Sequence, residues 1–142
     1  MKIRSKRTTS EDPSIPTRSG FEGMHVWWLL SKDSAGITGA VGAVAEIAPE
    51  IAHGLHRHDG YREVLYIEEG NGLFFTDSEI QRIQPGDMVT FEPGEWHAYV
   101  NDRASLTRLI SFYSADNYED IPYEEWVDWR PKYEELRHNV EG

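Results

Sequence analysis

The sequence predicts an all-β domain, either a sandwich or a barrel, that is followed by a short helical tail. Short runs rich in Val, Ile, Thr and aromatic residues recur between about Met24 and Tyr113, and turn signals that contain Gly or Pro separate them. Many short strands at fairly regular spacing are typical of sandwiches and barrels rather than of alternating strands and helices. The length of 142 residues suits one domain.

Eight of these runs are expected to form strands. They lie at His25–Leu30, Ala40–Ile47, Val64–Ile67, Gly72–Thr76, Ile80–Ile83, Asp87–Phe91, His97–Val100 and Leu106–Tyr113. We therefore expect the β domain to span residues 21–114, between a flexible N-terminal arm over residues 1–20 and an acidic C-terminal tail over residues 115–142.

The two ends of the chain differ in charge and in apolar content. The arm is basic and rich in Ser, Thr and Pro, which is typical of a mobile segment. In the acidic tail, Pro122 and Pro131 can each begin a short helix, and Trp126, Trp129 and Tyr133 follow at helical spacing. This aromatic stripe predicts a helical cap packed on the barrel, and the alternative is a lid over a ligand pocket.

The overall composition excludes several classes of function. The chain has 14 basic and 25 acidic residues, a formal net charge of −11, which argues against a nucleic-acid partner because such binding relies on basic side chains. It has no cysteine, so disulfides and cysteine nucleophiles are excluded. No stretch approaches the length of a membrane-spanning helix, and the basic start lacks the apolar middle of a signal peptide. We expect a cytoplasmic protein without a membrane partner.

Four side chains form a candidate metal site: His56, His58, Glu63 and His97. Residues i and i+2 of a strand face the same side, so the first two histidines project together. A turn at Asp59-Gly60 can bring the Glu63 carboxylate back to them, and His97 closes the site if its strand packs across from the pair. Three imidazoles and one carboxylate suit one divalent ion, such as Fe²⁺, Mn²⁺, Ni²⁺, Co²⁺ or Zn²⁺.

The framework around these residues resembles the cupin superfamily, in particular its small single-domain members. Two spaced motifs within residues 40–113 carry the resemblance, and the matching positions are His56, His58, Glu63, Gly70, Gly86, Gly94, His97 and Asn101. Two positions depart from the motifs, since Glu50 stands where the first begins with Gly, and Glu92 replaces a proline of the second. The resemblance implies a double-stranded β-helix, or jelly-roll, barrel in which His56, His58, Glu63 and His97 hold the metal.

Strand alternation indicates which side chains line the pocket beside the metal. If Glu63 points inward, Leu65 and Ile67 do too, and if His97 points inward, so does Tyr99. Tyr99 is therefore a candidate catalytic group, either as a hydrogen-bond donor or as a base, although it can equally serve only for packing. The last strand lines the pocket through either Arg108, Ile110 and Phe112, which suits an anionic substrate, or Leu109, Ser111 and Tyr113, which suits a neutral one.

Three further histidines lie outside the motifs. His53 is at odd parity with His56 and His58, so a regular strand would turn it away from the metal. His25 and His138 are expected to be structural or at the surface.

The site predicts a metal but not a reaction, because one scaffold supports many activities. The first hypothesis is an enzyme acting on a small organic substrate, most simply an Fe(II)-type dioxygenase or a related activity that cleaves C–C bonds. The second is a metal-assisted lyase or isomerase with a tyrosine base, and the third is a small-ligand-binding protein without turnover. Proteins of this kind and size are commonly dimers, so we also expect a homodimer.

Overall fold

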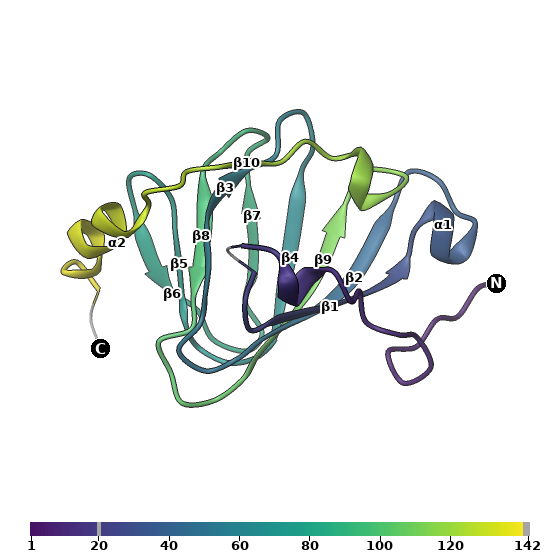
Figure 1. The fold of residues 1–142 in the computed structure, drawn as a ribbon, viewed down its shortest axis with the longest axis horizontal. Helices are drawn as coiled ribbons and strands as arrows, with labels where there is room; N and C mark the ends of the chain where they lie inside the picture. Colours follow the sequence, from purple (N-terminus) through teal and green to yellow (C-terminus); the bar gives the residue numbers. More distant parts are fainter. Residues whose placement is uncertain (20, 141–142) are drawn as a thin grey trace.

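The computed structural model describes residues 1–19 and 21–140 and is built mainly from two five-stranded antiparallel sheets (Figure 1). The first sheet has the order β1-β2-β9-β4-β7, with β1 Met24–Leu30, β2 Val41–Ile47, β9 Thr107–Tyr113, β4 Glu63–Glu69 and β7 Met88–Phe91. The second has the order β10-β3-β8-β5-β6, with β10 Glu124–Glu125, β3 Ala52–Arg57, β8 His97–Val100, β5 Leu73–Phe75 and β6 Ile80–Arg82. The all-β jelly-roll prediction is confirmed.

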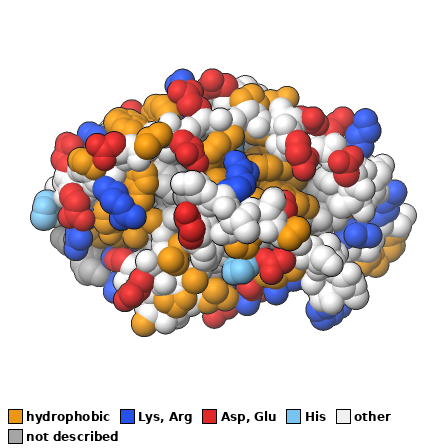
Figure 2. Space-filling view, in the orientation of Figure 1, with side chains coloured by type: hydrophobic (Ala, Val, Ile, Leu, Met, Phe, Trp, Pro, Cys, Tyr) orange, Lys and Arg blue, Asp and Glu red, His pale blue; other side chains and the backbone are white. Residues whose placement is uncertain are grey.

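In the described residues, four short helical segments accompany the sheets: η1 Ile15–Thr17, α1 Lys32–Ala35, η2 Tyr118–Asp120 and α2 Arg130–Arg137. No helix in the described part of the chain is long and apolar enough to cross a membrane. Acidic side chains are spread over the face in Figure 2 with basic ones between them, as the net charge leads one to expect.

Strand alternation builds the main core between the sheets. On β4, Leu65 and Ile67 are buried whereas Tyr66 between them is 38 % exposed, as the sequence predicts. Leu109 of β9 and Tyr99 of β8 belong to the same buried cluster, so both sheets contribute to it. Burial of these side chains is the main stabilising term for the fold.

Strand β3 is absent from the runs expected from the sequence, and its pairing is irregular. Its register with β8 shifts between His53 and His56, which is a β-bulge, so that His53 and His56 both face the interior. The turned-away orientation expected for His53 is therefore wrong. Inside the bulge, a Cβ on Gly54 would lie 2.6 Å from the Trp129 indole nitrogen, so only glycine allows this close approach.

The N-terminal segment packs against the barrel in the described residues. Ile15 and Phe21 are buried in the main core, and the Asp12 amide donates a hydrogen bond to the Val26 carbonyl at 2.8 Å. The expected mobility of residues 1–20 stays a prediction, and Gly20, like residues 141–142 of the tail, lies outside the described residues.

The tail runs along one rim of the sheets before it reaches α2 (Figure 1). Helix α2 begins at Arg130, with Pro131 in its first turn as predicted. The helical expectation for Pro122 and Trp126 is wrong, because β10 pairs with β3 and the Trp126 amide donates to the Leu55 carbonyl at 2.8 Å. Trp129 lies directly before α2, with helical backbone angles. The aromatic side chains of this stretch still pack with α2 on the outside of β3, β5 and β8.

Candidate metal centre

Three histidines converge at one end of the barrel interior. His56 near the end of β3 pairs across the sheet with His97 at the start of β8, and His58 follows directly after β3. All three are buried, and one ring nitrogen of each lies within 4.8 Å of those of the other two. Positions 41 residues apart in the sequence therefore meet because β3 and β8 are neighbours.

Glu63, the first residue of β4, reaches the same point from the opposite sheet. Gly60 has φ +79°, which lets the chain reverse between His58 and Glu63. One Glu63 carboxylate oxygen then lies 3.3 Å from His97 Nε2, and the other lies 3.7 Å from His58 Nε2. The four residues that the sequence singles out thus form one buried cluster.

Backbone carbonyls fix the orientation of every ring. The Nδ1 atoms of His56, His58 and His97 lie 2.7, 2.9 and 2.9 Å from the carbonyl oxygens of Gly54, Pro122 and Glu95. A carbonyl oxygen can only accept, so each Nδ1 carries the hydrogen and each neutral ring presents the Nε2 lone pair. Metal-binding histidines are held in this way, with the second nitrogen donating to a carbonyl or carboxylate.

Two electron-pair donors, a His97 nitrogen and a Glu63 oxygen, face each other at the centre of the cluster. Within the described residues, His97 Nε2 is buried without a hydrogen-bond partner, although it lies 3.3 Å from the carboxylate of Glu63. Two lone-pair donors that face each other at this distance repel unless a cation lies between them. These residues therefore fit a divalent ion, and they could hold one through three imidazoles and one carboxylate.

The protonation states also suit metal binding. Burial lowers the pKa of His56 well below its ordinary value, and the neighbouring imidazoles lower it further. Burial likewise lowers the pKa of His58. Burial alone would raise the pKa of Glu63, but the attraction of its carboxylate to His97 and His58 when these rings are protonated outweighs burial and lowers it to about 2. Neutral imidazoles and an ionised carboxylate are the forms that bind metals.

Three tyrosines surround the centre, and sequence reasoning offers only one of them, Tyr113, as one of two options. Tyr113 at the end of β9 donates a hydrogen bond to Glu63, and burial raises the pKa of this tyrosine well above its ordinary value. Tyr123 stacks on His56 with ring centroids 5.2 Å apart, and Tyr118 meets His58 edge-on at 6.3 Å. The inward option for the last strand pointed to Tyr113, but nothing in the spacing of the tail pointed to the other two.

The last strand turns its Leu109, Ser111 and Tyr113 face inward, which settles the two options that the sequence left open. These three side chains line a cavity of about 40 Å³ beside the histidines. Arg108 faces outward and pairs with Glu46 at 2.8 Å and Glu69 at 2.7 Å. The inner wall therefore carries no charge from Arg108.

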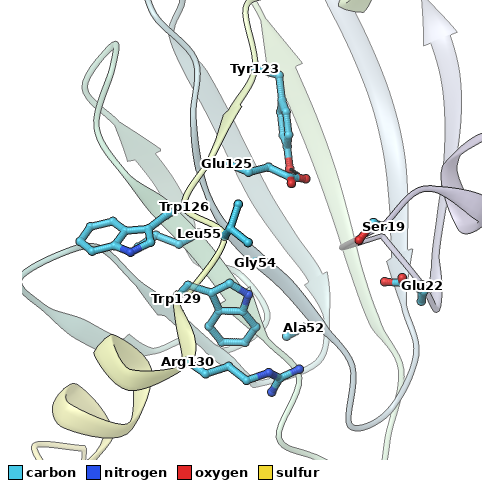
Figure 3. A pocket seen from close by; sticks show the side chains of 11 residues that line it. Ser19, Glu22, Ala52, Gly54, Leu55, Tyr123, Glu125, Trp126, Trp129 and Arg130 are labelled. Carbon is cyan, nitrogen blue, oxygen red and sulfur yellow. Dashed lines mark hydrogen bonds between the residues drawn. The ribbon is translucent and has the colours of Figure 1, made fainter.

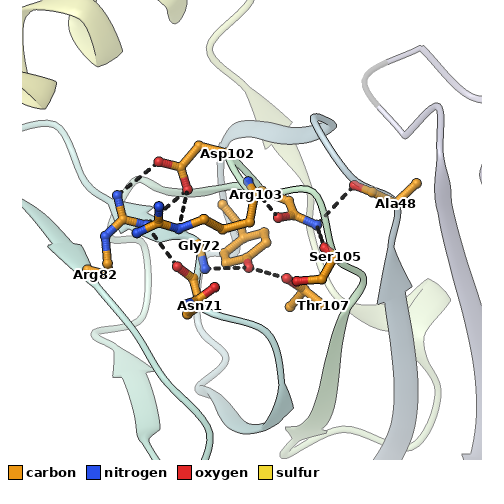
Figure 4. A network of polar contacts seen from close by, with 10 residues as sticks. Ala48, Asn71, Gly72, Arg82, Asp102, Arg103, Ser105 and Thr107 are labelled. Atoms are coloured by element: carbon orange, nitrogen blue, oxygen red, sulfur yellow. Dashed lines mark hydrogen bonds and ion pairs between the residues drawn. The ribbon is translucent and has the colours of Figure 1, made fainter. Parts of the chain in front are cut away.

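The expected pocket residues are only partly at the cavity. Leu65 and Tyr99 line it, whereas Ile67 is fully buried in the core and does not. The Tyr99 hydroxyl accepts a hydrogen bond from the Gly72 amide at 3.2 Å and contacts the Thr107 hydroxyl (Figure 4). Burial also raises the pKa of Tyr99. Because its hydroxyl is already engaged and its pKa is raised, Tyr99 is better suited to packing and hydrogen bonding than to a role as a base.

The remaining histidines differ in position. His53 lines the cavity with its ring centroid 4.1 Å from that of His56. His25 lies 2.6 Å from a Glu11 carboxylate oxygen in the N-terminal segment, and His138 is an exposed residue at the end of α2.

Comparison with known proteins agrees with the fold and the site. Residues 43–113 match the family model described as a cupin domain. An oxalate-binding protein of Thermotoga maritima is 32 % identical over 101 residues, which are 71 % of this chain and 83 % of that protein. The chain therefore belongs to the cupin family.

Solved structures of similar shape have diverse functions. A predicted oxalate decarboxylase from Thermotoga maritima has a TM-score of 0.70 and 23 % identity, covering 80 % of this chain and 99 % of that one. The polyketide cyclase RemF from Streptomyces resistomycificus has a TM-score of 0.76 and 16 % identity, covering 96 % of this chain and 94 % of that one. At these identities the likeness concerns the fold alone.

Proposed function

We propose that this cupin binds one divalent metal ion through His56, His58, Glu63 and His97 and uses it to bind a small carboxylate ligand. The observation that carries the proposal is the buried cluster of lone-pair donors, in which His97 Nε2 and a Glu63 oxygen face each other at 3.3 Å. The ion would supply a Lewis acid for an oxygen-containing ligand.

The chain's own residues would prepare the centre. The carbonyls of Gly54, Pro122 and Glu95 hold the three rings with Nε2 toward the ion, so little reorganisation accompanies binding. The Tyr113 hydroxyl holds the Glu63 carboxylate by a hydrogen bond. Burial excludes bulk water and thereby strengthens the electrostatic attraction between the ion and an anionic ligand.

The size of the cavity supports a small ligand. A volume of about 40 Å³ accommodates a few water molecules or a ligand of a few non-hydrogen atoms. The relative that is 32 % identical is an oxalate-binding protein, and oxalate is a ligand of this size. Oxalate is therefore the first ligand to test, and a bulky aromatic substrate would require the cavity to open.

An Fe(II)-type dioxygenase is the second candidate, because the same donor set suits Fe²⁺ and Leu65 adds an apolar wall. Oxygen uptake by the Fe²⁺-loaded protein with small carboxylate substrates would test it.

A lyase or isomerase that uses Tyr99 as its base is not proposed, because the Tyr99 hydroxyl is engaged with Gly72 and Thr107. A homodimer also stays a prediction, which light scattering can check.

The direct test of the proposed function combines metal analysis with ligand titration. Purified wild-type protein is expected to hold close to one divalent ion per chain, to bind oxalate only when loaded, and to lose both properties in His56→Ala. Equal metal content in the wild type and the variant would contradict the metal assignment. A loaded wild-type protein that does not bind oxalate would contradict the ligand assignment alone.

A further inference from the structure

The N-terminal segment and the tail meet along a seam that separates the metal centre from the surface. The seam is formed by Arg18 and Phe21 from the first and by Tyr118 and Tyr123 from the second. Inside the seam, the cavity beside the histidines adjoins a second cavity of about 30 Å³, since Met24 and Tyr113 line both. The second cavity is also lined by Phe21 of the N-terminal segment and Tyr118 of the tail. The two segments therefore form the outer wall of the interior space.

A larger pocket lies on the outer side of this seam (Figure 3). It has a volume of about 290 Å³, and its lining includes Ser19 and Glu22 from the N-terminal segment and Tyr123 and Glu125 from the tail. Tyr123 also stacks on His56, so one side chain borders both the surface pocket and the metal centre. Tyr123 of the seam therefore lies between the pocket and His56.

Arg18 bridges the two segments at this seam. Its guanidinium carbon lies 4.5 Å from the ring centroid of Phe21 and 5.5 Å from that of Tyr123. Burial raises the pKa of Tyr118 to about 12, and the positive charge of Arg18 also acts on this hydroxyl and partly opposes that shift. Arg18 itself is exposed, and a guanidinium stacked on aromatic rings keeps edge donors free for a carboxylate.

We propose that Arg18 selects an anionic ligand at the entrance to the metal centre. This inference rests on the proposed function, because it concerns the carboxylate ligand of the same site. The net charge of −11 and the carboxylates of Glu22 and Glu125 in the pocket repel an anion. Arg130 lies at the far end of this pocket from Tyr123, so Arg18 supplies the positive charge at the seam itself. The guanidinium offers the planar pair of donors that a carboxylate binds best.

Arg130 provides a matched control, because it lines the outer pocket and, like Arg18, stacks on an aromatic ring. It lies 4.7 Å from the ring centroid of Trp129, at the opposite end of the pocket from Tyr123 (Figure 3). Arg130→Gln therefore makes the same change of charge on the wall of the outer pocket without touching the seam.

The test uses Co²⁺-loaded full-length protein, freed of excess ion, and calorimetric titration with oxalate at two ionic strengths. Arg18→Gln is expected to leave the affinity for Co²⁺ unchanged, to weaken oxalate binding about tenfold and to flatten its salt dependence. Arg18→Lys should recover part of the affinity, whereas Arg130→Gln should stay within about twofold of the wild type.

Two results would overturn the inference while leaving the proposed function intact. One is oxalate binding by Arg18→Gln that equals the wild type in affinity and salt dependence. The other is an equal loss in Arg130→Gln, which would indicate a general charge effect. If the loaded wild type does not bind oxalate at all, the ligand assignment fails first and this inference fails with it.

Discussion

Buried polar groups at the two ends of strands β8 and β9 differ in whether the protein satisfies their hydrogen bonds. At one end, Asn101 after β8 donates to the carbonyls of Ile47, Ala48 and Ser105 at 3.1, 3.1 and 2.8 Å, and its oxygen accepts from the Arg103 amide. Figure 4 shows the contacts with Ala48, Ser105 and Arg103. At the other end, His97 at the start of β8 presents an Nε2 with no hydrogen bond in the described residues.

This difference provides a criterion that distinguishes a polar site that stabilises the fold from one that binds a ligand. Buried polar groups that serve the fold are satisfied within the protein, as Asn101 is. A cluster that leaves acceptors facing each other is incomplete without a further group, and the histidine end fits that description. Both ends carry cupin motif residues, so the motif alone does not separate the two roles. The predictions below test this contrast from its largest effect to its smallest.

The largest effect is expected when a proposed ligand is removed at the histidine end. His97→Ala should weaken metal binding by more than about 100-fold, since even partners outside the ligand set contribute 10- to 100-fold. Metal addition should then no longer raise the melting temperature, because that stabilisation follows from binding to the folded state alone. Calorimetry with and without metal measures the affinity and the change in melting temperature. If metal still stabilises the variant, His97 is not one of the metal ligands.

At the Asn101 end the opposite pattern is expected, namely a loss of stability without a loss of metal. Asn101→Ala leaves the carbonyls of Ile47, Ala48 and Ser105 without their donor, so the free energy of unfolding should fall by about 2–4 kcal/mol. Metal stoichiometry in the folded fraction should stay the same. Denaturant unfolding together with metal analysis checks this, and a loss of metal from folded Asn101→Ala protein would break the contrast between the ends.

A smaller effect is expected from Tyr113→Phe, which removes the hydroxyl that holds Glu63. Metal affinity should fall about tenfold while the fold persists, because the ring still packs in place. Competition with a chelator measures the affinity. Tyr99→Phe is the control, since that hydroxyl bonds Gly72 and Thr107 instead of a proposed ligand, and it should not change metal affinity. Equal losses in the two variants would contradict the role given to Tyr113.

The smallest effect concerns the backbone beside the Asn101 end. Glu50 adopts φ +62°, a left-handed conformation that favours glycine, and it occupies the position where the cupin motif begins with Gly. Glu50→Gly should therefore stabilise the fold by about 0.5 kcal/mol, because relief of strain exceeds the added freedom of the unfolded chain. Denaturant midpoints check this, and a destabilised variant would show that the Glu50 side chain contributes more than its strain costs.

The sequence predicted the fold from strand alternation and turn signals, whereas the meeting of the four candidate ligands followed from the resemblance to the cupin motifs. Alternation placed Leu65 inside and Tyr66 outside, and the motif spacing brought His56 and His97 together. His53 was misplaced because a bulge changes strand parity, and the residues that make the bulge carry no strong signal of their own.

The contributions of the tail could not be predicted from local spacing. The Pro122 carbonyl and the ring of Tyr123 reach the histidines only because β10 pairs with β3, and that pairing involves two exposed glutamates without an alternating pattern. The helical spacing of Trp126 and Trp129 was misleading, because packing on the outside of β3 overrode it. Long-range contacts of this kind are decided by the tertiary structure.

X-ray absorption at the metal edge of the Co²⁺-loaded protein tests the assignment of the buried cluster most directly. Three imidazole nitrogens and at least one carboxylate oxygen around the ion are expected, with one imidazole lost in His97→Ala. A purely oxygen environment, or a spectrum that His97→Ala leaves unchanged, would mean that the ion binds elsewhere.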